Sequence, residues 1–381
     1  MRIVLSGGGT GGHITPLLAT SAALASRAPE AEQLYIGEAG GMEERIARGS
    51  GLRFATISSG KYRRVHGARW YHQLADMRTL GLNLRDQARV ARGVVQALGL
   101  LRSYKPDVVF VKGGYVGLPV GIAAHLLRIP LVIHESDVYP GLTNRILSRW
   151  ATAVGTGFPT NNYRTLPRER LHYVGCPIRP ELLKAHRLQG LGEFKLEEGL
   201  PVVLITGGSQ GAMALNDAVL DDLPQLLEHA QVLHLTGERE YERVRFEFER
   251  LHGIRYPGRY HSYPFLGAEM PAAVAVADIV VARAGAQTIA ELAALGKATI
   301  LVPNYLMAGH QLENARVLSR QGAARVLDEA GLVRGQLAGE VALLIGDPTE
   351  KAQLEQAIAR LATPEAADTM AQLILEAGKR S

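Results

Sequence analysis

Two glycine-rich segments carry the residues best suited to bind a phosphate group. Residues 6–13 (SGGGTGGH) follow the apolar run 2–5, and residues 206–212 (TGGSQGA) follow the apolar run 202–205. Each segment leads into a stretch of helical character. A strand, a glycine-rich turn and a helix N-terminus together form an anion site, because backbone N–H groups point outward and missing Cβ atoms allow close approach. The repeat predicts two nucleotide-type halves.

A third segment, residues 283–291 (RAGAQTIAE), also runs from a predicted strand into a predicted helix. Amides at the start of that helix can hold a diphosphate. Glu291, on its first or second turn, can accept hydrogen bonds from both hydroxyls of a ribose. The alternative is that Glu291 interacts only with the helix dipole or with solvent.

His13 directly follows the first glycine segment. The unperturbed pKa of a histidine, near 6.5, suits a general base that takes a proton from an acceptor hydroxyl. A histidine beside a phosphate loop can instead bind the acceptor's pyrophosphate. Both roles stay open at this stage.

The segments between these motifs alternate between strand-like and helix-like patterns. Strands are predicted at 33–37, 52–57, 108–111, 130–133, 153–156, 202–205, 232–235, 260–263, 279–282 and 299–302. Helices are predicted at 42–48, in a stretch with Leu80, Leu84, Ala88, Ala91 and Val95 that ends near Tyr104, at 288–295 and over about 350–379. This alternation predicts parallel sheets with right-handed crossovers, which bind ligands beyond the carboxyl ends of their strands.

The length of 381 residues favours two domains. We expect an N-terminal domain at 1–173, a linker at 174–180 where paired prolines interrupt any periodicity, and a C-terminal domain at 181–360. Residues 361–381 are expected to form a last helix.

Composition and charge restrict the class of protein. The single cysteine, Cys176, excludes an intramolecular disulfide and fits a reducing compartment. The N-terminus shows no signal-sequence pattern and no window of about 18 apolar residues exists, so a cytoplasmic protein is expected. Residues 1–179 hold 23 Lys and Arg against 11 Asp and Glu, whereas the remainder has a net charge of −7. The basic half favours a polyanion or an anionic lipid surface as partner, with plain solubility as the alternative.

A dinucleotide-binding oxidoreductase is the first enzyme class to weigh. Gly7, Gly9 and Gly12 satisfy the G-x-G-x-x-G pattern, and Glu38 at the end of the second strand fits the ribose-binding acid. The second glycine segment, the adjacent His13, the loop at Gly113 and the helix start before Glu291 favour a different class.

Seven motifs in order give the chain its closest resemblance. They are GGGTGGHITP (7–16), KGGYVGLP (112–119), HES-D-x-x-PGLTNR (134–145), VGCPIR (174–179), TGGSQGA (206–212), RAGAQTIAE (283–291) and HQLENA (310–315). Over essentially its full length the chain resembles the MurG family, the UDP-N-acetylglucosamine:undecaprenyl-pyrophosphoryl-MurNAc-pentapeptide transferases of peptidoglycan synthesis. The resemblance implies an inverting glycosyltransferase of the GT-B type, with two Rossmann-like α/β domains whose parallel sheets face each other across a cleft. It also implies that the last helix packs back on the N-terminal domain.

The resemblance also assigns site residues. For catalysis it implies His13. For the donor UDP-GlcNAc it implies Thr10, Gly11, Gly12, Asp137, Arg179, Ser209, Gln210, Leu266, Ala286, Gln287, Thr288, Ile289, Ala290, Glu291 and Gln311. For the acceptor, undecaprenyl-pyrophosphoryl-MurNAc-pentapeptide, it implies Gly113, Gly114, Tyr115, His134, Glu135 and Asn144.

The chain departs from the family at two positions. The family usually has HEQN where residues 134–137 read HESD, so Asp137 replaces an amide, and a carboxylate beside a diphosphate must be protonated or paired. The family usually has Asp where Gly309 stands, which removes one hydrogen-bond acceptor on the sugar side.

The expected chemistry moves GlcNAc to the C4 hydroxyl of MurNAc with inversion. Glycine-loop amides and helix N-termini can stabilise the departing UDP, and no Asp-x-Asp pair or compact carboxylate cluster follows a strand, so no cofactor and no catalytic metal are expected. The basic, aromatic residues 61–72, with Leu74, Met77, Leu80 and Leu82 nearby, are the candidate membrane-docking surface. A solvated loop with an ordinary core helix is the alternative. The expected location is the cytoplasmic face of the inner membrane, and a cell-wall synthesis complex is a possible partner.

No nucleic-acid-binding signature is present. Three alternatives remain open: a transferase on the same fold with another lipid or aglycone acceptor, an NAD-dependent oxidoreductase, and a nucleotide-binding module without turnover.

Overall fold

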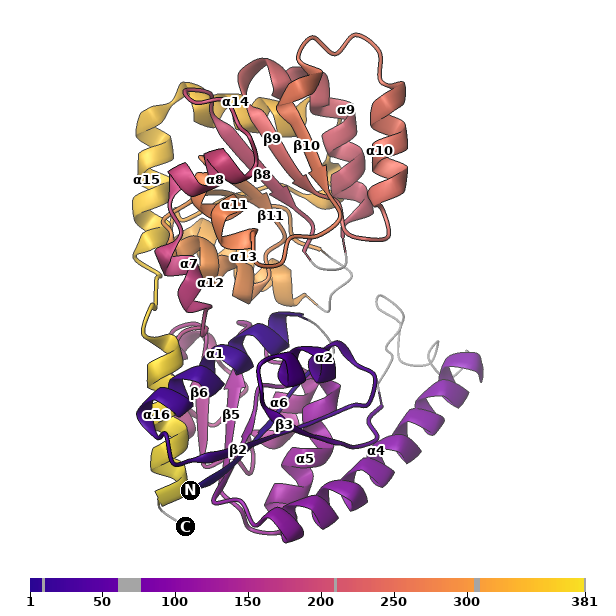
Figure 1. Ribbon diagram of the computed structural model, residues 1–381, viewed down its shortest axis with the longest axis vertical. Helices are drawn as coiled ribbons and strands as arrows, with labels where there is room; N and C mark the ends of the chain where they lie inside the picture. The colour runs from indigo at the N-terminus through magenta and orange to yellow at the C-terminus, as the bar shows by residue number, and fades with distance from the viewer. Residues whose placement is uncertain (9–10, 61–76, 209–210, 305–308, 380–381) are drawn as a thin grey trace. The chain divides into compact units, whose positions relative to one another are not determined.

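The computed structural model describes residues 1–8, 11–60, 77–208, 211–304 and 309–379. The chain divides into two compact units, one of residues 1–178 and 363–381 and one of residues 179–362 (Figure 1). Each unit is a parallel sheet covered by helices, so the prediction of two Rossmann-like α/β units is confirmed.

The N-terminal unit contains a seven-stranded parallel sheet in the order β3-β2-β1-β4-β5-β6-β7. Its strands are β1 (Arg2–Ser6), β2 (Glu32–Gly37), β3 (Arg53–Thr56), β4 (Val108–Val111), β5 (Leu131–Glu135), β6 (Ala153–Thr156) and β7 (Leu171–Tyr173). The central strands are buried on both faces, which explains their continuous apolar runs. The strand order reverses beside β1, so the switch point lies between β1 and β4.

The helices of this unit form two groups. They are α1 (Gly11–Arg27), α2 (Met42–Gly49), α4 (Met77–Tyr104), α5 (Gly114–Leu126), α6 (Leu142–Leu147) and α16 (Ala366–Lys379). α4, α5 and α6 pack together, and α1 packs against α16. Because crossovers on the two sides of a switch point run in opposite directions, right-handed connections place α1 and α5 on opposite faces of the sheet.

The C-terminal unit repeats the arrangement with six parallel strands in the order β10-β9-β8-β11-β12-β13. The strands are β8 (Val202–Thr206), β9 (Gln231–Leu235), β10 (Tyr260–Tyr263), β11 (Ile279–Ala282), β12 (Ala298–Leu301) and β13 (Arg325–Val326). The helices are α7 (Pro180–Lys184), α8 (Arg187–Glu193), α9 (Met213–His229), α10 (Tyr241–Arg250), α11 (Met270–Val276), α12 (Ala286–Ala294), α13 (His310–Arg320), α14 (Gln336–Gly346) and α15 (Pro348–Ala359). Its switch point lies between β8 and β11.

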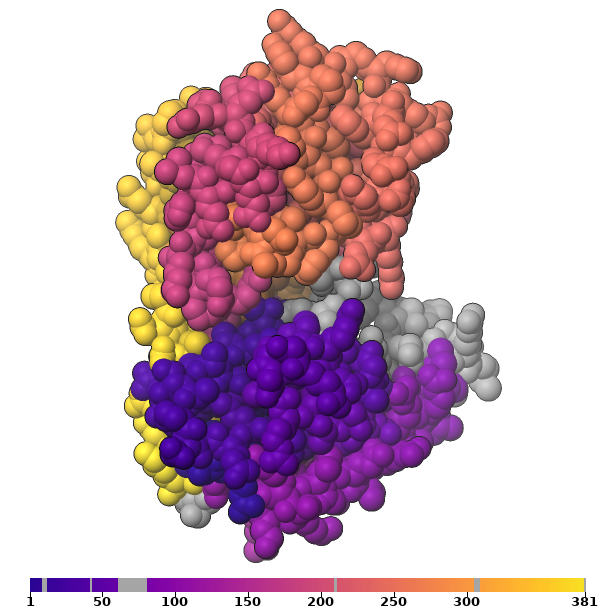
Figure 2. Space-filling model, in the orientation of Figure 1, coloured from indigo at the N-terminus to yellow at the C-terminus, as the bar shows by residue number. Residues whose placement is uncertain are grey.

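The C-terminal segment contributes to both units. The helical character predicted over about 350–379 is confirmed, and the chain breaks between α15 and α16. Pro364 lies in that break, where a proline disfavours helical geometry in the residue before it. α15 packs on β12 of the C-terminal unit, whereas α16 buries Met370 and Ile374 in the core of the N-terminal unit. Figure 2 shows the yellow α16 segment beside the indigo start of the chain.

Contacts around α16 show why it stays on the N-terminal unit. Arg27 on α1 forms an ion pair of 2.7 Å with Asp368 on α16. Gly175 has φ +84°, and a Cβ there would lie 1.9 Å from Thr363 Oγ1. Only a glycine therefore lets the residues before α16 pass the end of β7 so closely.

The helix predicted to end near Tyr104 is confirmed as α4. The face that packs on the rest of the unit is not the one that carries Leu84 and Val95. Leu84 and Val95 are 68% and 69% exposed, whereas Gly93 and Ala97 are buried. A Cβ at Gly93 would lie 2.0 Å from the carbonyl oxygen of Ser58. Small residues on this face allow the close approach that Leu84 and Val95 would prevent.

Candidate functional site

The carboxyl edge of the N-terminal sheet brings two glycine segments together at the switch point. Lys112 N–H donates to Ser6 O at 2.9 Å, and the Tyr35 hydroxyl donates to Gly7 O at 2.5 Å. Gly114 has φ +75°, and a Cβ there would lie 2.4 Å from the carbonyl oxygen of Gly8. The loops after β1 and β4 therefore pack backbone to backbone. Thr10 lies outside the described residues, whereas Gly11 and Gly12 begin α1.

His13 lies in the first turn of α1, partly buried. Burial is the main cause that lowers the pKa of the nearby His134 imidazole, the charge of Lys112 adds to it, and the charge of His13 contributes least. His134 is fully buried, and its Nε2 lies 2.7 Å from Gly175 O. A carbonyl oxygen only accepts hydrogen bonds, so Nε2 carries the proton. His134 is therefore a neutral side chain held in place by Gly175.

Glu135 organises the loop between β5 and α6. One of its oxygens accepts from the Asp137 N–H at 3.0 Å, and the other accepts from the Gly141 N–H at 2.8 Å and from Asn144 Nδ2 at 3.0 Å. Asn144 Nδ2 also donates to His134 O at 2.9 Å. Burial and the charge of Asp137 raise the pKa of Glu135. His134, Glu135 and Asn144, which the resemblance assigned to acceptor binding, thus lie together, and all three are buried and bond to the protein's own groups.

Lys112 lies in the KGGYVGLP motif, but the resemblance assigned it no role. It is 1% exposed, and its Nζ donates to Ser136 Oγ at 2.8 Å. Burial lowers its pKa, while Cys176 and the carboxylates of Glu135 and Asp137 act in the opposite direction. A lysine at the end of a predicted buried strand was the available signal, because a charge is seldom buried without a partner.

Glu38 does not fit the ribose acid of a dinucleotide site. Arg89 on α4 forms an ion pair and hydrogen bond with its carboxylate, and the Tyr115 hydroxyl donates to it at 3.2 Å. Burial and Glu38 raise the pKa of Tyr115 to about 12, so the phenol keeps its proton. Glu38 is therefore engaged within the protein, which argues against the oxidoreductase interpretation. The same contact positions Tyr115 beside the Gly113-Gly114 loop.

The corresponding edge of the C-terminal unit is braced around the loop after β11. Arg283 is 7% exposed, donates from Nη1 to Val302 O at 3.0 Å and pairs with Glu329. Asn314 Nδ2 donates to Ala284 O at 3.0 Å. Gly285 precedes α12 and no side chain caps the helix start. The loop before α12 is therefore held in place, and the start of this helix is a favourable position for an anion.

Glu291 lies on the second turn of α12 and is 9% exposed. Gln287 Nε2 donates to Glu291 Oε1 at 3.2 Å. Burial raises the pKa of Glu291, opposed by the positive charge of Arg179 and by the Gln287 hydrogen bond. Arg179 donates to Gly267 O at 3.2 Å, next to the buried Leu266. The structure thus brings together four of the predicted donor residues, namely Arg179, Leu266, Gln287 and Glu291. Of the other predicted residues on α12, Ala286 and Ile289 are buried and Ala290 is partly exposed.

The remaining donor predictions lie on two loops. Ser209 and Gln210 lie outside the described residues. The flanking turn is held by a Gly211 N–H to Gly208 O bond of 2.9 Å. Gln311 Oε1 accepts from the Asn304 N–H at 2.9 Å. Gly309 precedes α13 with φ +78°, a left-handed conformation that favours glycine over the aspartate expected there.

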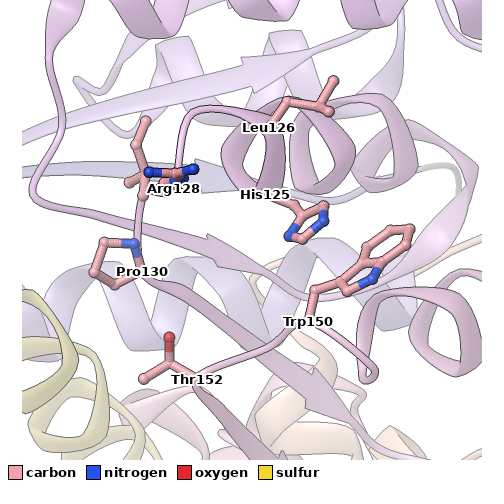
Figure 3. A pocket seen from close by; sticks show the side chains of 7 residues that line it. His125, Leu126, Arg128, Pro130, Trp150 and Thr152 are labelled. Carbon is pink, nitrogen blue, oxygen red and sulfur yellow. The ribbon is translucent and has the colours of Figure 1, made fainter.

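One pocket of about 440 Å³ lies at the opposite edge of the N-terminal sheet, where β5 and β6 begin. Figure 3 shows the His125 and Trp150 rings side by side, stacked at 4.4 Å between centroids. Arg128 and Pro130 line the same pocket. Since parallel α/β sheets bind substrates at their carboxyl ends, we assign no catalytic step to this pocket.

The described residues contain no group of three or more His, Cys, Asp or Glu side chains placed to hold a metal ion. Nor do they include a helix with the length and apolar character needed to cross a membrane.

Comparisons with known proteins agree on one family. The glycosyltransferase family 28 N-terminal domain matches residues 3–156, and its C-terminal domain matches residues 202–373. The chain is similar to the UDP-N-acetylglucosamine--N-acetylmuramyl-(pentapeptide) pyrophosphoryl-undecaprenol N-acetylglucosamine transferase of Symbiobacterium thermophilum, with 38% identity over 100% of this chain and 97% of the relative. The enzyme of the same description from Halothermothrix orenii is 36% identical over 100% of both chains.

Solved structures give the same result. MurG of Acinetobacter baumannii superposes with a TM-score of 0.71 at 25% identity, over 98% of this chain and 99% of that one. The UDP-GlcNAc 2-epimerase of Neisseria meningitidis superposes with a TM-score of 0.69 at 13% identity, over 99% of this chain and 100% of that one, a likeness of fold alone.

Proposed function

The chain belongs to glycosyltransferase family 28, among the transferases described above, and on that premise we propose that it transfers N-acetylglucosamine from UDP-GlcNAc to a lipid-linked acceptor. The acceptor is MurNAc-(pentapeptide)-pyrophosphoryl-undecaprenol, and its C4 hydroxyl is the nucleophile. The observation that carries the donor assignment is the cluster of Glu291, Gln287 and Arg179 beside the uncapped start of α12.

The C-terminal unit is proposed to bind the donor. The amides of Ala286, Gln287 and Thr288 hold the diphosphate, and Glu291 accepts hydrogen bonds from the ribose hydroxyls. Leu266 offers its backbone to the uracil, and Arg179 reaches the donor from beside Gly267. Ser209, Gln210 and Gln311 are proposed to complete the donor contacts.

The N-terminal unit is proposed to bind the acceptor beside Gly113, Gly114 and Tyr115. His134, Glu135 and Asn144 support that surface from beneath, because they are buried and hydrogen-bonded to the loop backbone. Thr10, Gly11, Gly12 and Asp137 are proposed to contact the sugar and diphosphate of the donor.

The reaction is a single displacement. The acceptor oxygen forms a bond to the anomeric carbon, and the bond between that carbon and the UDP oxygen breaks, with its electron pair leaving on UDP. His13 takes the hydroxyl proton or, in the alternative role, binds the acceptor's pyrophosphate. Fixed amide dipoles at α12 stabilise the charge that develops on UDP without a required metal.

We also propose a peripheral location on the cytoplasmic face of the inner membrane, bound to anionic lipids. α4 supports this, because Leu84 and Val95 are exposed at 68% and 69% on a helix that also carries the exposed Arg85 and Arg92. Residues 61–72, the candidate docking surface, lie outside the described residues. Flotation with acidic and neutral vesicles tests the proposal, and equal binding to both would contradict the electrostatic part.

A transfer assay tests the function. The purified protein is incubated with UDP-GlcNAc or UDP-GalNAc and the lipid acceptor, and the disaccharide product is quantified by mass spectrometry. We expect GlcNAc transfer, and calorimetry should show binding of UDP-GlcNAc but not of NADH. Binding of UDP-GlcNAc without transfer to any lipid would indicate a nucleotide-binding module, and binding of NADH alone would restore the oxidoreductase interpretation.

A further inference from the structure

Lys112 is a buried cation at the carboxyl edge of the N-terminal sheet. It follows the last residue of β4, and its ammonium reaches Ser136, which follows the last residue of β5. Its own N–H bonds to Ser6 at the end of β1. One residue thus ties three strand ends together. Burying an ammonium group is costly unless nearby charges and hydrogen bonds compensate.

The compensating charges are the two carboxylates on either side of Ser136. Glu135 is 4% exposed, and Asp137 is partly exposed. Both favour the charged form of Lys112, and Lys112 in turn favours the ionised form of Glu135. Because the Glu135 oxygens accept hydrogen bonds from the loop backbone and from Asn144, the position of this carboxylate is fixed. Its charge must be balanced from the sheet side, where Lys112 lies.

The main chain around Lys112 is equally constrained. Gly113 has φ +102° and Gly114 has φ +75°. A Cβ at Gly113 would lie 3.1 Å from Asn144 Nδ2. Because other contacts hold the loop backbone, a substitution of Lys112 should mainly change the charge of the site and leave the loop conformation intact.

We propose that Lys112 is a positioning residue that offsets one of the two negative charges of Glu135 and Asp137, so that this strand edge can receive a substrate bearing a diphosphate. The proposal rests on the proposed function, in which both substrates carry a diphosphate. Without Lys112, the formal charge of this cluster changes from −1 to −2, and the stronger repulsion weakens the binding of an anionic ligand. Asp137, the more exposed of the two, is then the main source of that repulsion.

A double-mutant cycle tests this coupling. Lys112→Met keeps the length and buried volume of the side chain and removes its charge, and Asp137→Asn removes the proposed source of repulsion. Binding of UDP-GlcNAc is measured by calorimetry for the wild type, both single variants and the double variant. Lys297→Met is the matched control, because Lys297 is a largely buried lysine whose ammonium bonds to the carbonyls of Ala275 and Ala277 at the other edge of its sheet.

We expect Lys112→Met to weaken UDP-GlcNAc binding about tenfold, and we expect the double variant to bind within about threefold of Asp137→Asn. Added salt should recover part of the loss in Lys112→Met, because screening reduces repulsion. Lys297→Met should bind normally. A purely structural role predicts no rescue, since Asp137→Asn restores neither packing nor the hydrogen bond to Ser136.

Unchanged binding in Lys112→Met, or a loss that Asp137→Asn does not relieve, would overturn the proposal. If the wild type binds no UDP-GlcNAc, the proposed function is wrong. The same four proteins are then titrated with inorganic pyrophosphate. Rescue of pyrophosphate binding by Asp137→Asn would support the role of Lys112 independently of the proposed function, and its absence would overturn that role.

Discussion

Replacing Glu291 with glutamine should change stability and donor binding in opposite directions. In the free protein, burial raises the pKa of Glu291 despite the opposing charge of Arg179. The folded state therefore binds this proton more tightly than the unfolded state, so the carboxylate lowers stability as pH rises through the unfolded pKa and past the folded one. At neutral pH, Glu291→Gln removes that cost, and the free protein should melt at a higher temperature.

Donor binding should suffer from the same substitution. The carboxylate can accept hydrogen bonds from the ribose hydroxyls on two charged oxygens, whereas an amide keeps one neutral acceptor. Hydrogen bonds to charged groups contribute about 1.5–3 kcal/mol, so the dissociation constant for UDP-GlcNAc should rise roughly 10- to 150-fold. Turnover at saturating donor should change less, because the ribose is remote from the anomeric carbon.

Calorimetry and thermal unfolding on the same samples check both signs. Glu355→Gln is the matched control, because Glu355 pairs with Lys351 on the partly exposed face of α15. The stability gain of Glu291→Gln should vanish below about pH 4.5, where both states hold the proton. Lower stability together with weaker binding would refute the reasoning, because it would make Glu291 a structural residue and not a desolvated ligand group.

Three other predictions follow from single observations. Gly114→Ala should lower the free energy of unfolding by about 1–3 kcal/mol in denaturant, because Gly114 has a φ of +75° and a Cβ there would lie 2.4 Å from Gly8 O. Gly99→Ala, in open space on α4, is the control and should raise that free energy by about 0.5–1 kcal/mol. Similar effects of the two substitutions would contradict a special constraint at Gly114. Burial lowers the pKa of His234 to about 3, so stability should fall as pH drops from about 6.5 toward 3, by at most about 1.4 kcal/mol per pH unit, and His234→Gln should flatten that slope. EDTA should leave GlcNAc transfer intact, and a complete loss that magnesium restores would show a required divalent ion.

Strand and loop placement followed from the sequence because its signals are local. Buried parallel strands such as β4 and β11 are continuous apolar runs, and the glycine segments follow them directly. β7 and β13 were missed, because three- and two-residue edge strands carry no periodicity. The packed face of α4 was not predicted for a related reason, since apolar residues at helical spacing do not reveal that Gly93 permits a close approach to Ser58.

The candidate site was predictable as a set of loops but not as a set of contacts. The resemblance placed Glu291, Gln287 and Arg179 on the donor side, and the structure brings them together around α12. It could not show that Glu135 and Asn144 are buried supports, or that Glu38 is engaged by Arg89. Those facts depend on side chains from strands and helices that are distant in sequence.

A buried cation follows the strand at the switch point of each unit. Lys112 follows β4, and Arg283 follows β11, the strand at the equivalent position in the second sheet. Each cation reaches the residue just after the next strand, Ser136 after β5 and Val302 after β12. Before an anion binds, contacts with it cannot hold the amides and glycines of such a loop in position. A buried cation bonded across neighbouring strand ends fixes the loop before the anion binds, while its own charge is offset by Glu329 at Arg283 and by Glu135 and Asp137 at Lys112.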